Sequence, residues 1–84
     1  MRILDQSGAF ADLPYELSEI SVSDGAIFAR FQGNSYVMAS YSSAEIALRA
    51  LKKLRIAYQQ HENNPEVGFG KFTEYFQFPQ EGDL

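Results

Sequence analysis

His61 is the only histidine in this 84-residue sequence, and cysteine is absent. A histidine acts as a general base when a nucleophile lies within hydrogen-bond reach, and no serine or cysteine stands near His61 in the sequence. His61 could still be a general base if the fold brings a nucleophile to it. One histidine cannot build a multi-histidine metal site, and without cysteine there is no thiolate ligand or disulfide. We therefore predict that His61 lies near a helix C-terminus, where its cation favours the helix dipole, and that it binds no metal or cofactor.

Acidic residues are the second group that could do chemistry. Asp5 with Asp12, or Glu16 with Glu19, could bind a hard cation or flank a sugar for glycoside hydrolysis. However, the chain has 11 acidic residues, so such pairs arise easily by chance. We predict no catalytic residue and no enzyme activity, and a small hydrolase remains a less favoured alternative.

A glycine-rich stretch, Gly68–Lys71, resembles the Gly-Phe-Gly core of an RNA-recognition strand, in which aromatic rings stack on bases. A true match carries a basic residue before the first glycine, whereas Glu66 and Val67 stand there. Nor is Gly70-Lys71 a phosphate loop, which needs more glycine spacing and a following Ser or Thr. We interpret the stretch as a loop that leads to the last strand, and its role stays open.

The basic residues are unevenly distributed along this acidic chain. The net charge is −4 and the pI is about 4.8. Four of the seven basic residues lie in one predicted helix: Arg49, Lys52, Lys53 and Arg55. They form either a solvated helix face or a strip for an acidic partner. Nucleic acid is an unlikely partner of so acidic a chain, although a nucleic-acid-associated regulator remains an alternative.

The residues from Ser42 to His61 predict a long helix. Ser42 and Glu45 have the spacing of a capping box, which predicts the start of the helix. The residue before Pro65 is disfavoured in the helical conformation, which predicts that the helix ends before Pro65. Apolar residues recur at steps of three and four, which predicts one buried stripe. Its expected members are Ala44, Ala47, Leu48, Leu51, Leu54 and Tyr58.

Turn residues predict hairpins before the helix. Asp24-Gly25 favours a type I′ turn, and a two-residue loop places Val22 opposite Ile27 and Ile20 opposite Ala29. The same argument at Gly33-Asn34 sets the next register. It places Phe31 opposite Tyr36 and Ala29 opposite Met38.

Two further segments complete the predicted sheet. Arg2–Asp5 and Phe10–Leu13 flank a turn at Gln6-Ser7-Gly8, and Phe72–Phe78 alternates as a final strand that Pro79 ends. Residues 80–84 are expected to form a mobile tail. The predicted fold class is α+β in one domain of residues 1–84. It is an antiparallel β-meander with one long helix on one face and a strand after the helix, in the order β-β-β-β-β-α-β.

Four motifs resemble a family of small uncharacterised proteins from Firmicutes and their phages. They are Met1–Gly8, Leu13–Glu16, Tyr41–Glu45 and Phe76–Gln80. Many relatives carry a longer insertion between the helix and the last strand, which this sequence lacks between Pro65 and Lys71. The family has no assigned activity, so the resemblance implies a bacterial setting and no catalytic residue.

The predicted registers leave apolar residues on the second face of the sheet, where a two-layer domain would expose them. Either a second subunit covers this face, or the first hairpin or the Phe72–Phe78 strand covers it within one chain. Such a patch commonly marks a contact surface. Ile56, on the polar side of the helix, suggests a further contact. The expected interface residues are Phe28, Val37, Ala39, Tyr41 and Ile56.

No apolar run is long enough for a signal peptide or a membrane span, and the absence of cysteine suits a reducing compartment. We therefore expect a small cytoplasmic protein-interaction or accessory module that acts as a homodimer. Its activity and partner are not evident from the sequence.

Overall fold

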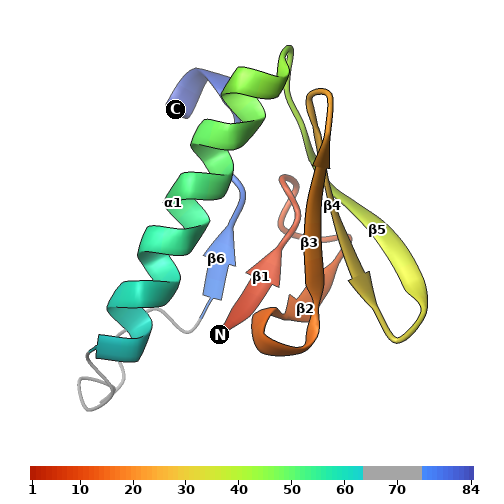
Figure 1. Ribbon diagram of the computed structural model, residues 1–84, viewed down its shortest axis with the longest axis vertical. Coiled ribbons are helices and arrows are strands. Elements are labelled where there is room, and N and C mark those ends of the chain that lie inside the picture. Colours follow the sequence, from red (N-terminus) through yellow and green to blue (C-terminus); the bar gives the residue numbers. More distant parts are fainter. Residues whose placement is uncertain (64–74) are drawn as a thin grey trace.

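The computed structural model describes residues 1–63 and 75–84 and has an α+β fold, as predicted (Figure 1). The Gly68–Lys71 loop and the first part of the predicted last strand lie outside the described residues. The strands are β1 (Arg2–Leu4), β2 (Asp12–Pro14), β3 (Glu19–Ser23), β4 (Ala26–Phe31), β5 (Asn34–Ser40) and β6 (Tyr75–Gln77). The helix is α1 (Ala44–Asn63), and two 3-10 turns are η1 (Tyr15–Leu17) and η3 (Glu81–Asp83).

The strands form two small sheets instead of one continuous meander. One sheet has the order β3-β4-β5 and is antiparallel throughout. The other has the order β2-β1-β6, in which Ile3 pairs with Leu13 on the antiparallel side and with Phe76 on the parallel side. The last strand therefore joins the first strand, after the helix has returned the chain.

The predicted register of the β3–β4 hairpin is confirmed. Val22 pairs with Ile27 and Ile20 with Ala29. The turn itself is not type I′, because Asp24 has a φ of 54° while Gly25 has no positive φ. A type I′ turn needs positive φ at both central residues.

The predicted turn at Gly33-Asn34 is wrong by one residue. The turn residues are Gln32 and Gly33, with φ of 54° and 83°, so that Phe31 pairs with Asn34. Type I′ geometry explains the shift, since glycine is the residue that best tolerates positive φ at the second position. As a result Ala29 pairs with Tyr36, and the predicted pairing with Met38 is also wrong.

An irregularity in β5 changes which side chains reach the core. Phe28 pairs with Val37, but Ile27, the residue before Phe28 in β4, pairs with Ala39. Met38 is therefore an extra residue in β5. A bulge of this kind re-aims the side chains beyond it. Met38 and Ala39 are therefore both buried.

The helix begins one residue later than the capping box predicted. Ser43 caps it, because the Ile46 amide donates to Ser43 Oγ at 3.2 Å and the Ala47 amide donates to the Ser43 carbonyl at 3.1 Å. Ser42 instead donates its amide and hydroxyl to the Glu81 carboxylate, at 2.8 and 2.6 Å. Residues 80–84, expected to be a mobile tail, thus include a turn that is bound to the start of the helix.

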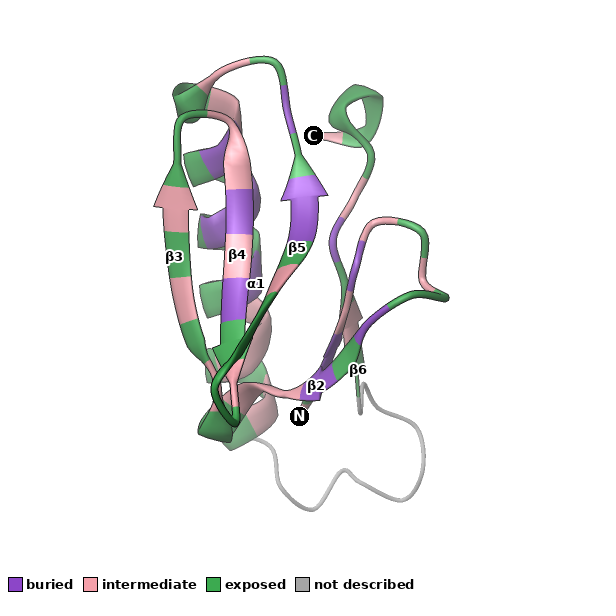
Figure 2. Ribbon diagram, turned by 90° about the vertical axis from the view of Figure 1, so that its right-hand side faces the viewer, coloured by how far each residue is buried: buried purple, intermediate pink, exposed green. Residues whose placement is uncertain are grey.

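The buried stripe of α1 is displaced from the predicted one. Ala47, Leu51 and Leu54 are buried as expected, whereas Leu48 and Ala44 are exposed. Figure 2 shows α1 behind β3-β4-β5, with its buried residues toward the sheet. Side chains of the second sheet and of the C-terminal segment complete the core, chiefly Ile3, Leu13 and Phe78.

Gln6 connects the two sheets. Its amide donates to the Met38 carbonyl at 2.8 Å, and its side-chain oxygen accepts from the Ser40 amide at 2.9 Å. Its side-chain amide donates to the Pro79 carbonyl at 3.1 Å. Gln6 therefore holds the bulged end of β5 against the C-terminal segment. Within the described residues, no helix is both long and apolar enough to cross a membrane.

Candidate functional site

Asp5 and Asp12, proposed as a carboxylate pair, serve separate structural roles. Asp5 is buried in the β1–β2 turn, where its carboxylate accepts hydrogen bonds from the Ser7 hydroxyl at 2.9 Å and the Phe10 amide at 3.1 Å. Burial raises the pKa of Asp5, but these hydrogen bonds, together with those from the Ala11 and Ser7 amides, outweigh burial and hold the pKa below its ordinary value. Asp12 is exposed and pairs with Arg2 at 2.6 Å. The two carboxylates thus have different partners.

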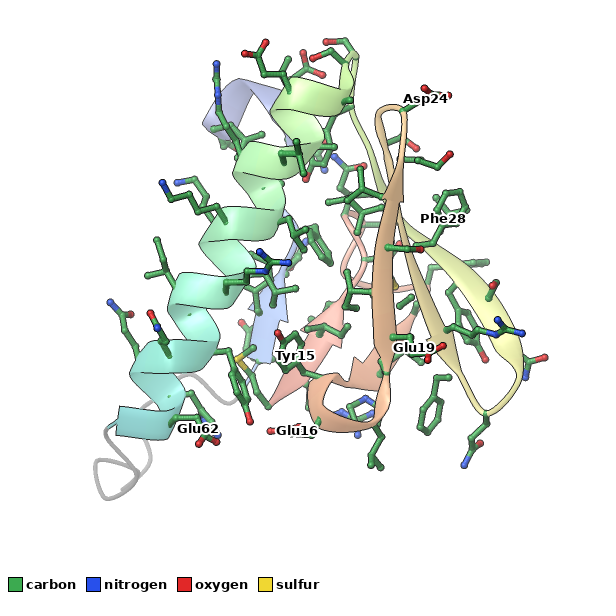
Figure 3. All side chains as sticks on the ribbon, viewed as in Figure 1. Tyr15, Glu16, Glu19, Asp24, Phe28 and Glu62 are labelled. Carbon is green, nitrogen blue, oxygen red and sulfur yellow. The ribbon has the colours of Figure 1, made fainter. Side chains whose placement is uncertain are left out.

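The second proposed pair, Glu16 and Glu19, is also divided. Glu16 lies in η1 and accepts from the Met1 ammonium at 2.8 Å, whereas Glu19 lies on β3 opposite Arg30 (Figure 3). Burial raises the pKa of Glu16, but hydrogen bonds from the Met1 ammonium and from its own backbone amide, with the nearby positive charges, together outweigh burial and lower the pKa. In the part of the chain that the structure describes, no three His, Asp or Glu residues are placed to hold a metal ion.

His61 belongs to an aromatic group at the C-terminal end of α1. Its ring stacks on Tyr58 with a centroid distance of 6.2 Å, and Tyr58 lies 4.5 Å from Tyr15. The Tyr58 hydroxyl donates to the Glu62 carboxylate at 2.9 Å. Sequence reasoning missed Tyr15, which comes from η1 and meets the helix only through the tertiary fold. The group packs η1 against α1.

Ala39 and Tyr41, predicted to lie on the second face of the sheet, are buried. The bulge at Met38 turns Ala39 into the core. The Tyr41 hydroxyl donates to the Pro79 carbonyl at 2.8 Å, and burial raises the pKa of Tyr41 to about 12. Ala39 and Tyr41 are thus covered within one chain, which is one of the two possibilities that the sequence left open.

The other two sheet residues of the predicted interface, Phe28 and Val37, lie together on the surface. Phe28 is partly exposed and points away from α1 (Figure 3), and its cross-strand neighbour Val37 is 52% exposed. Ser21 pairs with Phe28 from the other side, so the three form a row across the sheet. We call the surface around this row the outer sheet face. It consists of Glu19, Ser21, Phe28, Arg30, Ser35 and Val37.

Ile56 does not join this surface. It is 45% exposed. With about 100° of rotation per helical residue, it lies roughly opposite the buried Leu54. Ile56 thus faces away from the sheet, while Phe28 faces away from the helix. The predicted interface is divided between opposite sides of the molecule.

Two strongly exposed apolar side chains were not singled out by sequence reasoning. Phe10 is 83% exposed and Leu17 is 71% exposed. Phe10 follows the turn that Asp5 organises, and Leu17 ends η1. Neither lies on the outer sheet face. Their position in short connections between strands is the signal that could have marked them as exposed.

The electrostatic character of α1 differs from that of the outer sheet face. The four Lys and Arg residues of α1 are all exposed. They are Arg49, Lys52, Lys53 and Arg55.

Two surfaces therefore stand out on the described residues: an apolar row on the outer sheet face and a basic strip on the helix. Comparisons of the chain with protein-family models, with curated proteins and with solved structures gave no match.

Proposed function

We propose that the protein is a small protein-interaction module of the bacterial cytoplasm that acts as a homodimer and contacts a partner protein through the outer sheet face. The observation that carries this proposal is the half-exposed Val37 beside Phe28, with the polar residues Glu19, Ser21, Arg30 and Ser35 around them. An aromatic side chain surrounded by polar residues is the usual composition of an interaction hot spot.

The size of the chain supports self-association. A single domain of 84 residues buries only about 60 to 65% of the surface of its unfolded chain, so its stability is limited. A second copy adds buried surface and stabilises the folded state by mass action.

Light scattering after size exclusion tests the homodimer. We expect a mass twice the chain mass of 9.5 kDa at micromolar concentrations. A monomer mass at every concentration would rule out the dimer.

Partner capture from a bacterial lysate tests the outer sheet face. Phe28→Ser removes the aromatic centre of the face and should abolish capture of any specific protein that the wild-type chain retains. Leu17→Ser is the matched control, because Leu17 is exposed but lies outside the face. Equal loss with both variants would contradict the assignment.

The exposed basic strip of α1 favours one alternative, a nucleic-acid-associated regulator. Phosphate contacts made by Lys and Arg weaken steeply with added salt. Titration of labelled oligonucleotides distinguishes the two functions. We expect no binding at physiological salt, and salt-sensitive micromolar binding that is lost in Lys52→Ala/Lys53→Ala would favour the alternative.

A further inference from the structure

Strand β3 has an open edge. Ser23 and Ala26 close a two-residue turn and therefore form a hydrogen-bonded pair, as do Ser21 and Phe28 two residues on. By alternation, the backbone amides and carbonyls of Ile20 and Val22 point away from β4. Figures 1 and 2 together show no described element beyond this edge of the sheet.

The other sheet edges carry features that discourage further pairing. Edge strand β2 is short and ends at Pro14, and β6 has three residues. Strand β5 is bulged, and Gln6 bonds to its outer side at Met38 and Ser40. In contrast, β3 contains no proline, lysine or bulge, which are the usual means of blocking an edge.

We infer that two copies of the chain pair antiparallel along β3 and join their sheets into one six-stranded sheet. This inference rests on the proposed homodimer and specifies its geometry. The symmetric register that uses all of β3 places Ser21 opposite Ser21 of the second copy. Ile20 then exchanges main-chain hydrogen bonds with Val22 of the second copy.

The charges of β3 suit this register. Glu19 is its only charged residue. In the symmetric pairing Glu19 lies opposite Ser23 of the second copy, whose hydroxyl can donate to the carboxylate. The two Glu19 side chains are therefore not opposed, and two small Ser21 side chains meet at the symmetry axis.

The available apolar area favours edge pairing over face packing. Burial of Ala39 and Tyr41 leaves only Phe28 and Val37 as apolar residues of the predicted sheet interface. Two partly exposed side chains supply little apolar area for two copies to bury against each other. Edge pairing adds main-chain hydrogen bonds. It also leaves both outer sheet faces open, side by side on one surface, for a partner protein.

Charge substitutions on β3 test the register. Ser21→Glu opposes two carboxylates at the symmetry axis and should weaken the dimer. Ser23→Lys faces Glu19 of the second copy and should strengthen it, because two symmetric ion pairs lower Kd by roughly twofold to thirtyfold. Ser35→Glu is the matched control, an exposed serine on the opposite edge of the same sheet, and should leave Kd unchanged.

Hydrogen exchange tests the main-chain pairing directly. The amides of Ile20 and Val22 should become protected as protein concentration rises, whereas the Ser35 amide, which also faces away from β4, should not. A monomer at all concentrations would overturn both the dimer and the edge pairing. A dimer in which Ile20 and Val22 exchange freely, or in which Phe28→Ser lowers the mass while Ser21→Glu does not, would overturn the edge pairing alone.

Discussion

The carbonyl oxygen of Tyr41 occupies the space in which a Cβ atom on Gly25 would stand. The two backbones are held together by a hydrogen bond from the Tyr41 amide to the Gly25 carbonyl, 2.8 Å long. Position 25 therefore requires glycine because two backbone segments approach each other closely there. A positive φ is not the reason, since Gly25 does not have one.

Gly25→Ala should destabilise the protein by about 1–3 kcal/mol, because the obstructing atom belongs to the backbone and cannot rotate away. Gly82→Ala is the matched control, since a Cβ there meets nothing within 4 Å and the φ of Gly82 is not positive. Urea denaturation of both variants measures the difference. Equal stability of the two would contradict the steric argument.

Leu54→Ala should lower the free energy of unfolding by about 2–5 kcal/mol, because the Leu54 side chain is fully buried. Leu48→Ala changes the same residue type in the same helix, but its side chain is 54% exposed, so we expect a much smaller loss. Denaturant midpoints at constant m-value provide the comparison. If both substitutions cost the same, the assigned buried stripe of α1 is wrong.

Asp5→Asn should cost about 1.5–3 kcal/mol at neutral pH, because the buried carboxylate accepts hydrogen bonds that stabilise its charged form. Asp12→Asn is the control. It removes an exposed ion pair with Arg2 and should cost about 0–1 kcal/mol.

Acid denaturation gives a second measurement on Asp5. Its pKa in the folded state lies below the ordinary value of 3.8, so the unfolded chain binds more protons between these two values. The stabilisation is complete above about pH 4 and is lost as the pH falls through the lowered pKa. In the Asp5→Asn variant, the free energy of unfolding should fall less steeply as the pH is lowered through this range. If it falls as steeply as in the wild type, Asp5 is not the source of the pH dependence.

Tyr41 should titrate near pH 12, because burial raises its pKa from the ordinary value of 10.0. The unfolded chain releases this proton first, so the contribution of Tyr41 to stability is complete below pH 10 and is lost as the pH rises toward 12. Absorbance titration of wild type and Tyr41→Phe isolates this phenolate. The substitution also removes the hydrogen bond to Pro79 and should cost about 1 kcal/mol at neutral pH.

Several local features of the protein follow from the sequence alone. The β3–β4 register follows from a two-residue turn and alternation, and both operate within a few residues of Asp24-Gly25. The existence of the long helix follows from its apolar periodicity in the same way. These features were predicted correctly because neighbouring residues alone specify them.

Contacts between distant segments select among several arrangements that are locally acceptable. Ser42 and Ser43 can both cap a helix, and the choice falls on Ser43 because Ser42 bonds to Glu81, 39 residues away. Burial of Ala39 and Tyr41 depends likewise on the bulge in β5 and on the Pro79 carbonyl from the end of the chain. Side-chain periodicity could not decide what covers these two residues, because it assumes a regular strand. Gln6 and Pro79, which are distant in the sequence, bind the bulged β5 and Tyr41.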